Sequence, residues 1–249
     1  MESIWKNTAE LPSFPSLKED VKTDVLIIGG GITGILTAYF LKEVGVNYLL
    51  VEKDKICTHT TGNTTAKITF QHGLIYKKLL YKMGSDTAKA YLKANRLAFS
   101  KYEELAKKIN CDYERKDNYV YSLKNRKKIE NEVNALMQIG YDAELCDRCE
   151  LPIKIAGAVK FKDQACFNPL KFIAAIANDL NIYEHTPVTE MVGTTALTPF
   201  GKIRAQRVIV ATHFPFINKH GSYFLKLYQH RSYVLALDNA AQMNSMYVD

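Results

Sequence analysis

A glycine-rich turn near the start of the chain, within TDVLIIGGGITGILTAYFLKEVGVNYLLVEK, constrains the fold most strongly. Gly29, Gly31 and Gly34 have the spacing G-x-G-x-x-G between an apolar run, Asp24–Ile28, and a helical pattern, Ile32–Val44. In such a motif the first glycine allows a tight turn, and the second lets the backbone approach a pyrophosphate. The third lets the helix pack closely on the strand. The spacing therefore predicts a strand–turn–helix unit that binds a dinucleotide.

The residues after this helix strengthen the prediction. Asn47–Val51 reads as a second apolar strand, and it ends at Glu52. An acidic residue at that point accepts hydrogen bonds from a ribose hydroxyl. The start of the helix offers unpaired N–H groups and the positive end of its dipole to phosphates. Because strand, helix, strand and acid follow in the required order, we prefer a dinucleotide site to a glycine-rich turn of an ordinary α/β protein.

Composition narrows the class of protein. The chain has 249 residues, 47% of them hydrophobic and 24% charged, which suits one large domain or two interwoven ones. No apolar run approaches the ~20 residues of a membrane helix, and the N-terminus lacks a secretory signal, so we expect a cytoplasmic protein without a membrane span. The net charge is +7, but the lysines are dispersed, so we expect no nucleic-acid partner.

The five cysteines give no metal or disulfide signature. Their number is odd and their spacing irregular, which argues against a disulfide framework. Cys146 and Cys149 form a lone C-x-x-C, without the second pair or the histidines that a zinc site would require. We therefore expect two unpaired thiols at this motif and no metal.

A threonine-rich stretch, DKICTHTTGNTTAKIT, follows the second strand. It holds six threonines together with a glycine and an asparagine, a composition typical of a loop. Threonine hydroxyls and backbone amides suit the oxygens of phosphates and polyols, although a polar surface loop has the same composition. Its place directly after the dinucleotide unit favours the ligand-facing interpretation.

Further helices and strands are predicted downstream. Apolar residues at helical spacing predict two helices, Gly84–Ile109 and Asn125–Ile139. Asn168 and Pro169 are typical of a helix start, and that helix should end near Leu180. The remaining patterns indicate strands at Asp112–Leu123, Ile182–His185 and Val188–Val192, a hairpin turn at Thr198–Gly201, and a fully apolar strand of a buried parallel sheet at Arg207–Ala211.

Several motifs in this order resemble one family. GGGITGILTAYFL, Glu52, TTGNTTAKIT, ACFNPLKF, the pair Pro187-Val188 and RVIVATHFPF resemble the FAD-dependent oxidoreductases of the D-amino-acid oxidase and glycine oxidase superfamily. The similarity is strongest to the branch in which the flavoprotein domain is often followed by a Rieske iron–sulfur domain, and it extends from about Ser3 to the end. NAD sites lack the threonine-rich segment, so the resemblance favours FAD as the cofactor.

The resemblance implies an α/β fold with a Rossmann-like FAD-binding βαβ domain and an interleaved, incomplete α+β substrate domain. We expect an N-terminal arm over 1–22, a discontinuous FAD-binding domain over 23–83 and 150–215, and a substrate or cap domain over 84–149 and 216–249. The chain ends in the strand-like run Tyr247–Asp249, so we expect a fragment, a short natural form being the alternative.

The resemblance also implies roles for individual residues. The pyrophosphate would be held at the glycine turn, the AMP ribose by Glu52 with Lys53 beside it, and the diphosphate side by two threonines. Three further residues would lie near the ribityl chain and the flavin ring, one would meet adenine, and a strand-end turn would close over the cofactor. The pyrophosphate residues are Gly29, Gly31, Ile32, Thr33 and Gly34, and the ribose residues are Glu52 and Lys53. Thr60 and Thr61 are the threonines of the diphosphate side, and Thr65, Ala66 and Lys67 are the residues near the ribityl chain and the ring. Val188 would meet adenine, and Ala211 and Thr212 form the strand-end turn.

The chain departs from the family pattern in three respects. The second glycine-rich flavin motif, which the resemblance places beyond residue 249, is absent, and so is the C-x-H…C-x-x-H pattern of a Rieske site. Where the family usually has Ala-Thr-Gly, this chain has Ala211-Thr212-His213. Covalent attachment of flavin through His59 is an alternative to a surface histidine.

The activity implied by the resemblance is oxidation of an amine or amino-acid-like substrate by hydride transfer to the flavin. Oxygen or an iron–sulfur partner would then accept the electrons. Lys67, His72, His230 and Arg231 are the weak candidates for catalytic residues; a solvent-facing lysine, structural histidines and a surface salt bridge are the competing interpretations. The alternative function is an FAD- or nucleotide-binding fragment without turnover, because the C-terminal half of the site is missing.

Overall fold

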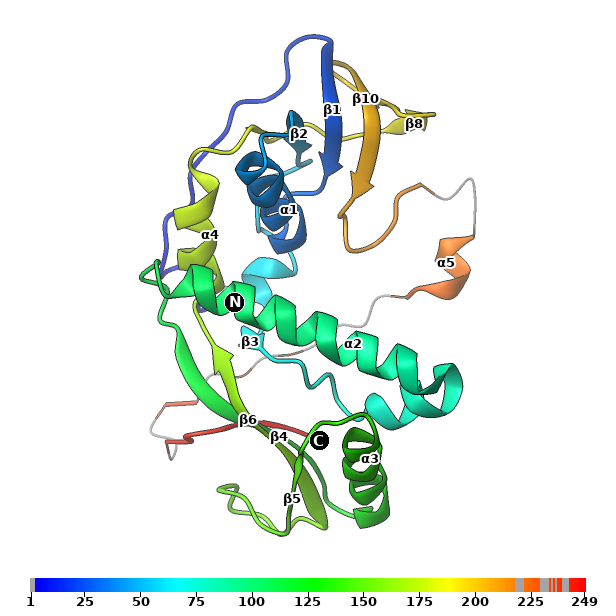
Figure 1. The fold of residues 1–249 in the computed structure, drawn as a ribbon. Coiled ribbons are helices and arrows are strands. Elements are labelled where there is room, and N and C mark those ends of the chain that lie inside the picture. Colours follow the sequence, from blue (N-terminus) through cyan, green and yellow to red (C-terminus); the bar gives the residue numbers. More distant parts are fainter. Residues whose placement is uncertain (1–2, 218–221, 229–232, 234, 236, 239–241) are drawn as a thin grey trace. The chain divides into compact units, whose positions relative to one another are not determined.

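The computed structural model describes residues 3–217, 222–228, 233, 235, 237–238 and 242–249. The chain divides into two compact units, which are drawn together in Figure 1. Unit 1 comprises Met1–Thr65 and Asn168–Leu235, and unit 2 comprises Ala66–Phe167 and Ala236–Asp249. From the sequence, we expected the boundaries between the two domains near residues 83 and 150. The observed breaks fall elsewhere because β3 (Lys67–Ile68) pairs with β6 (Gly157–Cys166), so both strands belong to unit 2.

Unit 1 contains the predicted βαβ unit within a six-stranded sheet of order β7-β2-β1-β10-β9-β8. β1 pairs in parallel with both β2 and β10, and β2 pairs in parallel with β7, whereas β9 and β8 continue the sheet antiparallel. The strands are β1 Val21–Ile28, β2 Tyr48–Val51, β7 Ile182–Tyr183, β8 Glu190–Val192, β9 Thr195–Thr198 and β10 Gly201–Val210. β1 begins at Val21, so the expected arm over 1–22 loses its last residues to the sheet.

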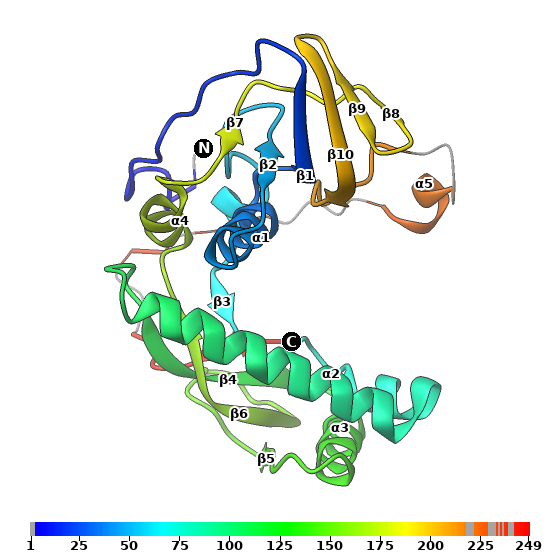
Figure 2. The same cartoon turned by 45° about the horizontal axis from the view of Figure 1, so that its top comes forward.

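Three helices and one turn of 3-10 helix complete the described elements of unit 1. α1 spans Ile32–Glu43 and packs against β1 and β2 (Figure 2). α4 spans Pro169–Ala177, and the Asn168 side chain accepts hydrogen bonds from two amides of its first turn, which confirms the predicted N-cap. This helix stops short of Leu180. η1, the 3-10 turn, covers Thr61–Asn63, and a short helix, α5, covers Tyr223–Lys226.

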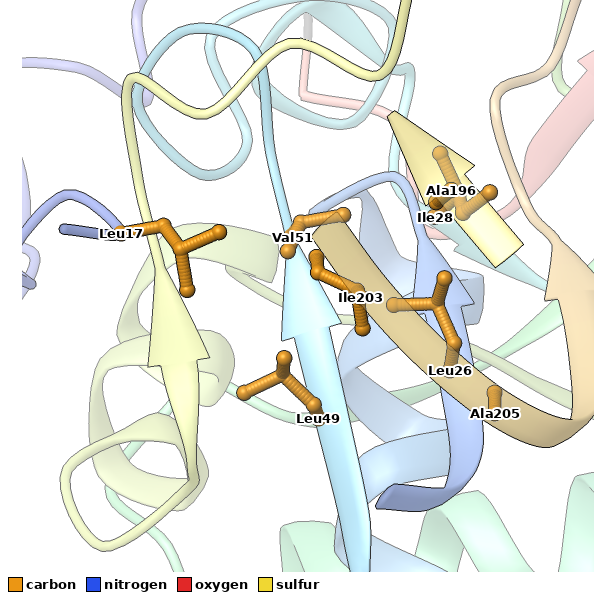
Figure 3. Close-up of a cluster of buried hydrophobic side chains, with 8 residues drawn as sticks. All are labelled: Leu17, Leu26, Ile28, Leu49, Val51, Ala196, Ile203 and Ala205. Carbon is orange, nitrogen blue, oxygen red and sulfur yellow. The ribbon is translucent and has the colours of Figure 1, made fainter. Parts of the chain in front are cut away.

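The core of unit 1 is aliphatic and is built on the parallel strands. Leu26 and Ile28 of β1 pair with Leu49 and Val51 of β2, and all four side chains are buried. Figure 3 shows them grouped with residues from the arm, β9 and β10: Leu17, Ala196, Ile203 and Ala205. Burial of such side chains is the main source of folding free energy. The sheet therefore holds the glycine turn at the carboxyl end of β1 on a rigid base.

β10 contains the apolar strand predicted at Arg207–Ala211. It runs parallel to β1, as expected, but it is not buried over its whole length. Ile203 and Ala205 lie in the core, whereas Ile209 and Val210 are 36% and 45% exposed. The prediction of a fully buried strand at Arg207–Ala211 is therefore wrong for its carboxyl end. The fully buried side chains of β10 lie only in its first half.

Unit 2 has its own sheet of five strands, in the order β11-β4-β6-β3 with β5 paired to β6. β4 pairs antiparallel with β6 over almost its full length, and β11 pairs in parallel with β4. The elements not yet given are α2 Tyr76–Ala106, β4 Glu114–Ser122, α3 Arg126–Gln138, β5 Glu144–Cys146 and β11 Met246–Val248. No helix in the described part of the chain is long and apolar enough to cross a membrane.

The long helix of unit 2 consists of two helices joined at a kink, and the second begins where the sequence pattern predicted. α2 starts at Tyr76, and Gly84, the predicted start, is a non-helical break within it, with φ 83° and ψ 169°. The amides of Tyr76 and Lys77 donate to the carboxylate of Glu132 on α3, at 2.7 and 2.9 Å. A carboxylate supplied by another helix thus satisfies the first turn, which local sequence could not reveal.

Candidate functional site

The glycine turn is built from close backbone contacts. Gly29 has φ +114°, and a Cβ atom there would lie 2.6 Å from the carbonyl oxygen of Ala211. A Cβ atom on Gly34 would lie 1.9 Å from the carbonyl oxygen of Gly29. Both distances are shorter than any real contact, so only glycine fits at either position. The third glycine therefore lets α1 approach β1, as the spacing predicted.

The start of α1 presents backbone donors. The amide of Ile32 donates to Thr61 Oγ1 at 3.0 Å. The amides of Gly31, Thr33 and Gly34 have no acceptor among the residues that the structure describes. Together with the positive end of the helix dipole, these amides form a place where the oxygens of an anion such as a diphosphate can bind.

Glu52 lies at the carboxyl end of β2 and is held in place by the backbone. Its Oε2 accepts from the amide of Gly30 at 2.7 Å, and its Oε1 accepts from the amide of Asp54 at 2.9 Å. The residue is only 9% exposed. Because each carboxylate oxygen has two lone pairs, both can accept a further hydrogen bond from a hydroxyl group. The side chain is thus oriented before any ligand binds.

An ion-paired group borders Glu52 in the following loop. His59 Nε2 lies 2.8 Å from Asp54 Oδ2, and Lys53 Nζ lies 3.1 Å from the same oxygen. Hydrogen bonds from His59 and then from Lys53 hold the pKa of the Asp54 carboxyl below its usual value. Oxygen and nitrogen atoms of Glu52, Asp54 and His59 lie within 4.8 Å of one another, a grouping that sequence reasoning had not noticed.

The threonine-rich loop is fixed to the glycine turn by short-range contacts. Thr61 is buried and accepts the amide of Ile32, as described above. A Cβ atom on Gly62 would lie 2.4 Å from the carbonyl oxygen of Cys57, so the loop folds tightly on itself. Thr60 is exposed next to this turn. Of the predicted loop residues, Thr61 is therefore the one that directly contacts the helix start.

Two residues hold this loop to the rest of unit 1, and of these sequence reasoning missed Glu184. Glu184, 1% exposed, accepts from the amide of Ile56 at 2.8 Å and from the amide of Phe14 at 3.1 Å. Trp5 donates from Nε1 to the carbonyl oxygen of Thr64 at 2.7 Å. These partners are far apart in sequence, so no local pattern could have pointed to them.

The strand-end turn after β10 adopts an unusual backbone. The amide of Ala211 donates to the carbonyl oxygen of Ile28 at 2.8 Å, which places the turn beside the glycine turn. Thr212 Oγ1 donates to the carbonyl oxygen of Phe214. His213, where the resembled family usually has glycine, has φ +63° and is exposed. The left-handed conformation that glycine favours is thus present here with a histidine. Val188 packs against the core of the sheet.

The remaining site candidates of the described chain lie in unit 2, apart from Thr65, which ends the first segment of unit 1. Ala66 is buried, with φ +59°. Lys67 donates to Asn118 Oδ1 and to the carbonyl oxygen of Tyr247, and burial lowers the pKa of its ammonium group. His72 is exposed, with Nδ1 2.7 Å from the hydroxyl of Tyr91. His230 and Arg231 lie outside the described residues.

The cysteines lie outside this chemistry. All five are free. Burial raises the pKa of the Cys57 thiol to about 12, and the nearby carboxylates of Glu52 and Glu184 add to the shift. Burial likewise raises the pKa of Cys146, to about 11. Thiols with such pKa values are protonated at neutral pH and are therefore poor nucleophiles and poor metal ligands.

Comparison with known proteins gives the chain its relatives. It is 34% identical over 249 residues to YhfW of Bacillus subtilis, which is named as a Rieske 2Fe-2S iron–sulfur protein. The match covers 95% of this chain and 49% of YhfW. It is 24% identical over 219 residues to gamma-glutamylputrescine oxidoreductase of Escherichia coli, covering 80% of this chain and 50% of that protein. The chain thus spans about half the length of these curated relatives.

Solved structures show the same fold. L-proline dehydrogenase from P. horikoshii matches 78% of this chain and 53% of its own, with a TM-score of 0.63 at 16% identity. Glycine oxidase from Bacillus cereus matches 76% of this chain and 55% of its own, with a TM-score of 0.55 at 22% identity. The family model for FAD dependent oxidoreductases (DAO) matches residues 24–248. The chain therefore belongs to the family of FAD dependent oxidoreductases.

Proposed function

We propose that the chain binds FAD at the glycine turn and serves an oxidoreductase that removes a hydride from an amine or amino-acid-like substrate. One observation carries the proposal: the acceptor-free amides of Gly31, Thr33 and Gly34 lie at the start of α1, while the fixed carboxylate of Glu52 ends the neighbouring strand. These are the groups that a diphosphate and a ribose require. When bound, FAD supplies the two-electron chemistry, and the protein supplies binding and orientation.

Each residue then has a defined task. The acceptor-free amides of Gly31, Thr33 and Gly34 would bind the pyrophosphate, with Gly29 and Ile32 of the same turn beside it. Glu52 would accept hydrogen bonds from the AMP ribose, with Lys53 next to it. The loop hydroxyls would face the diphosphate, and Thr65, Ala66 and Lys67 would lie along the ribityl chain and the ring. Val188 would meet adenine through its backbone. The remaining residues of this assignment are Thr60, Thr61, Ala211 and Thr212.

The amine or amino-acid class of substrate is supported by the names of the similar proteins. They include an oxidase for glycine, a dehydrogenase for L-proline, deaminases for L-amino acids and an oxidoreductase for gamma-glutamylputrescine. Similarity to a protein named for a Rieske cluster supports an iron–sulfur electron acceptor, with oxygen as the alternative. The chain spans about half the length of its curated relatives, so the activity of the whole protein is part of this proposal.

A titration of the purified chain with FAD tests the proposal. We expect saturable binding that perturbs the visible absorbance of the flavin, followed by anaerobic bleaching when an amino acid or amine substrate is added. Saturable binding without bleaching by a panel of amino acids and polyamines would favour the FAD-binding chain without turnover. A chain that stays colourless and takes up no FAD would contradict the proposal.

A further inference from the structure

The first half of α2 carries a concentration of lysines without carboxylate partners. From Lys77 to Lys93 the chain has five lysines and a single acidic residue, Asp86. No carboxylate of a described residue lies within ion-pair distance of these five lysines. At the other end of the same helix the lysines are paired, as Lys101 is with Glu104 at 2.6 Å. We call residues 77–93 the basic tip.

The lysines of the basic tip are all exposed, whereas Leu92 of the same segment is buried in unit 2. Residues four apart share one face of an α-helix. Lys78 and Lys82 have this spacing in the first part of α2, before its kink. Lys89 and Lys93 have the same spacing in the second part. Their ammonium groups therefore form an exposed positive surface, to which Lys77 also belongs.

Two large apolar side chains project from the basic tip. Tyr81 is 89% exposed and Met83 is 60% exposed. Gly84, which follows them, has φ +83° and no neighbour within 4 Å of an added Cβ atom, so the chain turns there in open space. The kinked end of α2 extends past α3 in both views (Figure 1, Figure 2). The tip thus presents an aromatic ring and a thioether among the ammonium groups.

A surface of this composition fits the headgroups of anionic phospholipids. The negative surface potential of a membrane attracts lysines, and clusters of about four to eight basic residues on a helix are typical of phosphatidylserine binding. Tyrosine is enriched at the level of the headgroups, because its ring is apolar and its hydroxyl is polar. Protein–protein interfaces, by contrast, are depleted in lysine. Single strands of nucleic acid bind in basic grooves, whereas this surface is a projecting helix end.

We propose that the basic tip docks the chain on the surface of a membrane that contains anionic phospholipids. Attraction between the ammonium groups and the headgroups provides most of the affinity. Tyr81 and Met83 enter the headgroup layer, while Leu79 and Leu80 of the same helix stay half-buried in unit 2, so the contact is peripheral. This inference goes beyond the proposed function and does not depend on FAD binding.

Flotation of the chain with vesicles, in the presence and in the absence of FAD, tests the inference. We expect vesicles of phosphatidylcholine and phosphatidylserine to carry the chain, and vesicles of pure phosphatidylcholine to leave it free. Sodium chloride at about 1 M, where the Debye length falls to about 3 Å, should release it. On the charged vesicles, hydrogen exchange should slow at the amides of the basic tip and stay unchanged in α3.

Two triple variants of equal charge locate the surface. The tip variant combines Lys78→Gln, Lys82→Gln and Lys89→Gln. It should bind the charged vesicles about a hundredfold more weakly, at roughly fivefold for each lysine removed from the membrane surface. The matched control removes three lysines that are paired with Glu103 or Glu104 at the other end of α2, and it should bind as wild type does: Lys101→Gln, Lys107→Gln and Lys108→Gln. Circular dichroism checks that both variants are folded.

A second pair of variants tests the apolar contact. Met83→Ser should weaken binding to the charged vesicles several-fold, because the side chain loses its place in the headgroup layer. The control is Met137→Ser, which changes a methionine that is 56% exposed on α3 and should leave the binding unchanged. Neither substitution alters the charge of the chain, so this measurement is independent of the lysine variants.

Three results would overturn the inference: no flotation with the charged vesicles, equal flotation with charged and neutral vesicles, or equal weakening in the two lysine variants. Tighter binding to RNA or DNA than to the charged vesicles, lost in the tip variant, would also overturn it, because the basic tip would then be a nucleic-acid surface. FAD binding without flotation contradicts this inference alone. Flotation of a chain that takes up no FAD supports it while contradicting the proposed function.

Discussion

A Cβ atom on Gly34 would lie 1.9 Å from the carbonyl oxygen of Gly29, so the third glycine of the motif presses the first turn of α1 onto the end of β1. This contact determines where the helix starts. It places the acceptor-free amides at the start of α1 beside the carboxyl ends of the parallel strands. The proposed cofactor site therefore depends on a backbone contact that a single methyl group would break.

Gly34→Ala should accordingly destabilise the chain and abolish FAD binding. Overpacking of this kind costs about 1–3 kcal/mol, which urea denaturation of variant and wild type would measure. Gly45→Ala is the control, because Gly45 follows the same helix with φ +71° but has no neighbour within 4 Å of its added Cβ. It should lose stability through its backbone conformation and still bind FAD. Normal FAD binding by Gly34→Ala would contradict the account of the turn.

Removal of the Glu52 carboxylate should weaken FAD binding. The account predicts a loss of about 1–3 kcal/mol for Glu52→Ala, as for other hydrogen bonds that involve a charged group. Fluorescence titration with FAD would measure it. Glu43→Ala, at the exposed end of α1, serves as the control and should leave the affinity unchanged. If Glu52→Ala bound FAD as tightly as wild type, Glu52 would have no ribose role.

Glu132 should make the stability of the chain depend on pH. Its desolvation raises its pKa in the folded chain, against the lowering effect of the amides of Lys77 and Tyr76. The unfolded pKa is about 4.3. Because the folded value is higher, this group contributes its full stability below about pH 4.3 and loses it as the pH rises through the folded pKa. Relative to Glu132→Gln, wild type should thus lose stability on going from pH 4 to pH 7.

Urea denaturation of both proteins at several pH values would measure this difference. The substitution keeps the shape of the side chain but only one of its two acceptor oxygens, so one amide of the α2 start loses its acceptor at every pH and the pH dependence of the difference reports the titration. Wild-type and Glu132→Gln curves that remain parallel across this pH range would contradict the assignment of the shift to Glu132.

Trp5 should report on the threonine-rich loop. It is the only tryptophan of the chain, and its indole N–H donates to the carbonyl oxygen of Thr64. We expect FAD to quench its emission saturably, because flavin absorbs at the wavelengths where tryptophan emits. Trp5→Phe removes the hydrogen bond while keeping an aromatic ring, and it should destabilise the folded chain by about 1 kcal/mol in urea denaturation, as for the loss of one hydrogen bond. Emission that is unaffected during saturating FAD binding would place the cofactor away from this loop.

The sequence predicted those parts of the fold that depend on contacts between residues close together in the chain. The spacing of Gly29, Gly31 and Gly34 predicted strand, turn and helix because each glycine has a steric reason to be there. Asn168 was predicted as an N-cap because its side chain satisfies amides only two and three residues away. The contact of Gly34 with Gly29 and those of Asn168 with its two amides lie within a few residues of the chain, so the sequence displays them directly.

Contacts between distant residues could not be predicted in this way. Glu184 is separated from Ile56 by 128 residues, yet it fixes the loop after β2. Glu132 determines where α2 begins from 56 residues away. The boundaries of the two units could not be predicted either, because they depend on the pairing of β3 with β6, which are far apart in sequence. In unit 2, the hydrogen bond between Lys67 and Asn118 could not be predicted for the same reason.

The central claim is that the start of α1 and Glu52 form an FAD site, and its most direct test is equilibrium titration of the purified chain with FAD. The account predicts saturation at one FAD per chain, with binding lost in Gly34→Ala and weakened in Glu52→Ala, while Gly45→Ala and Glu43→Ala bind normally. Absence of saturable binding to the folded wild-type chain, or equal binding by Gly34→Ala, would contradict it.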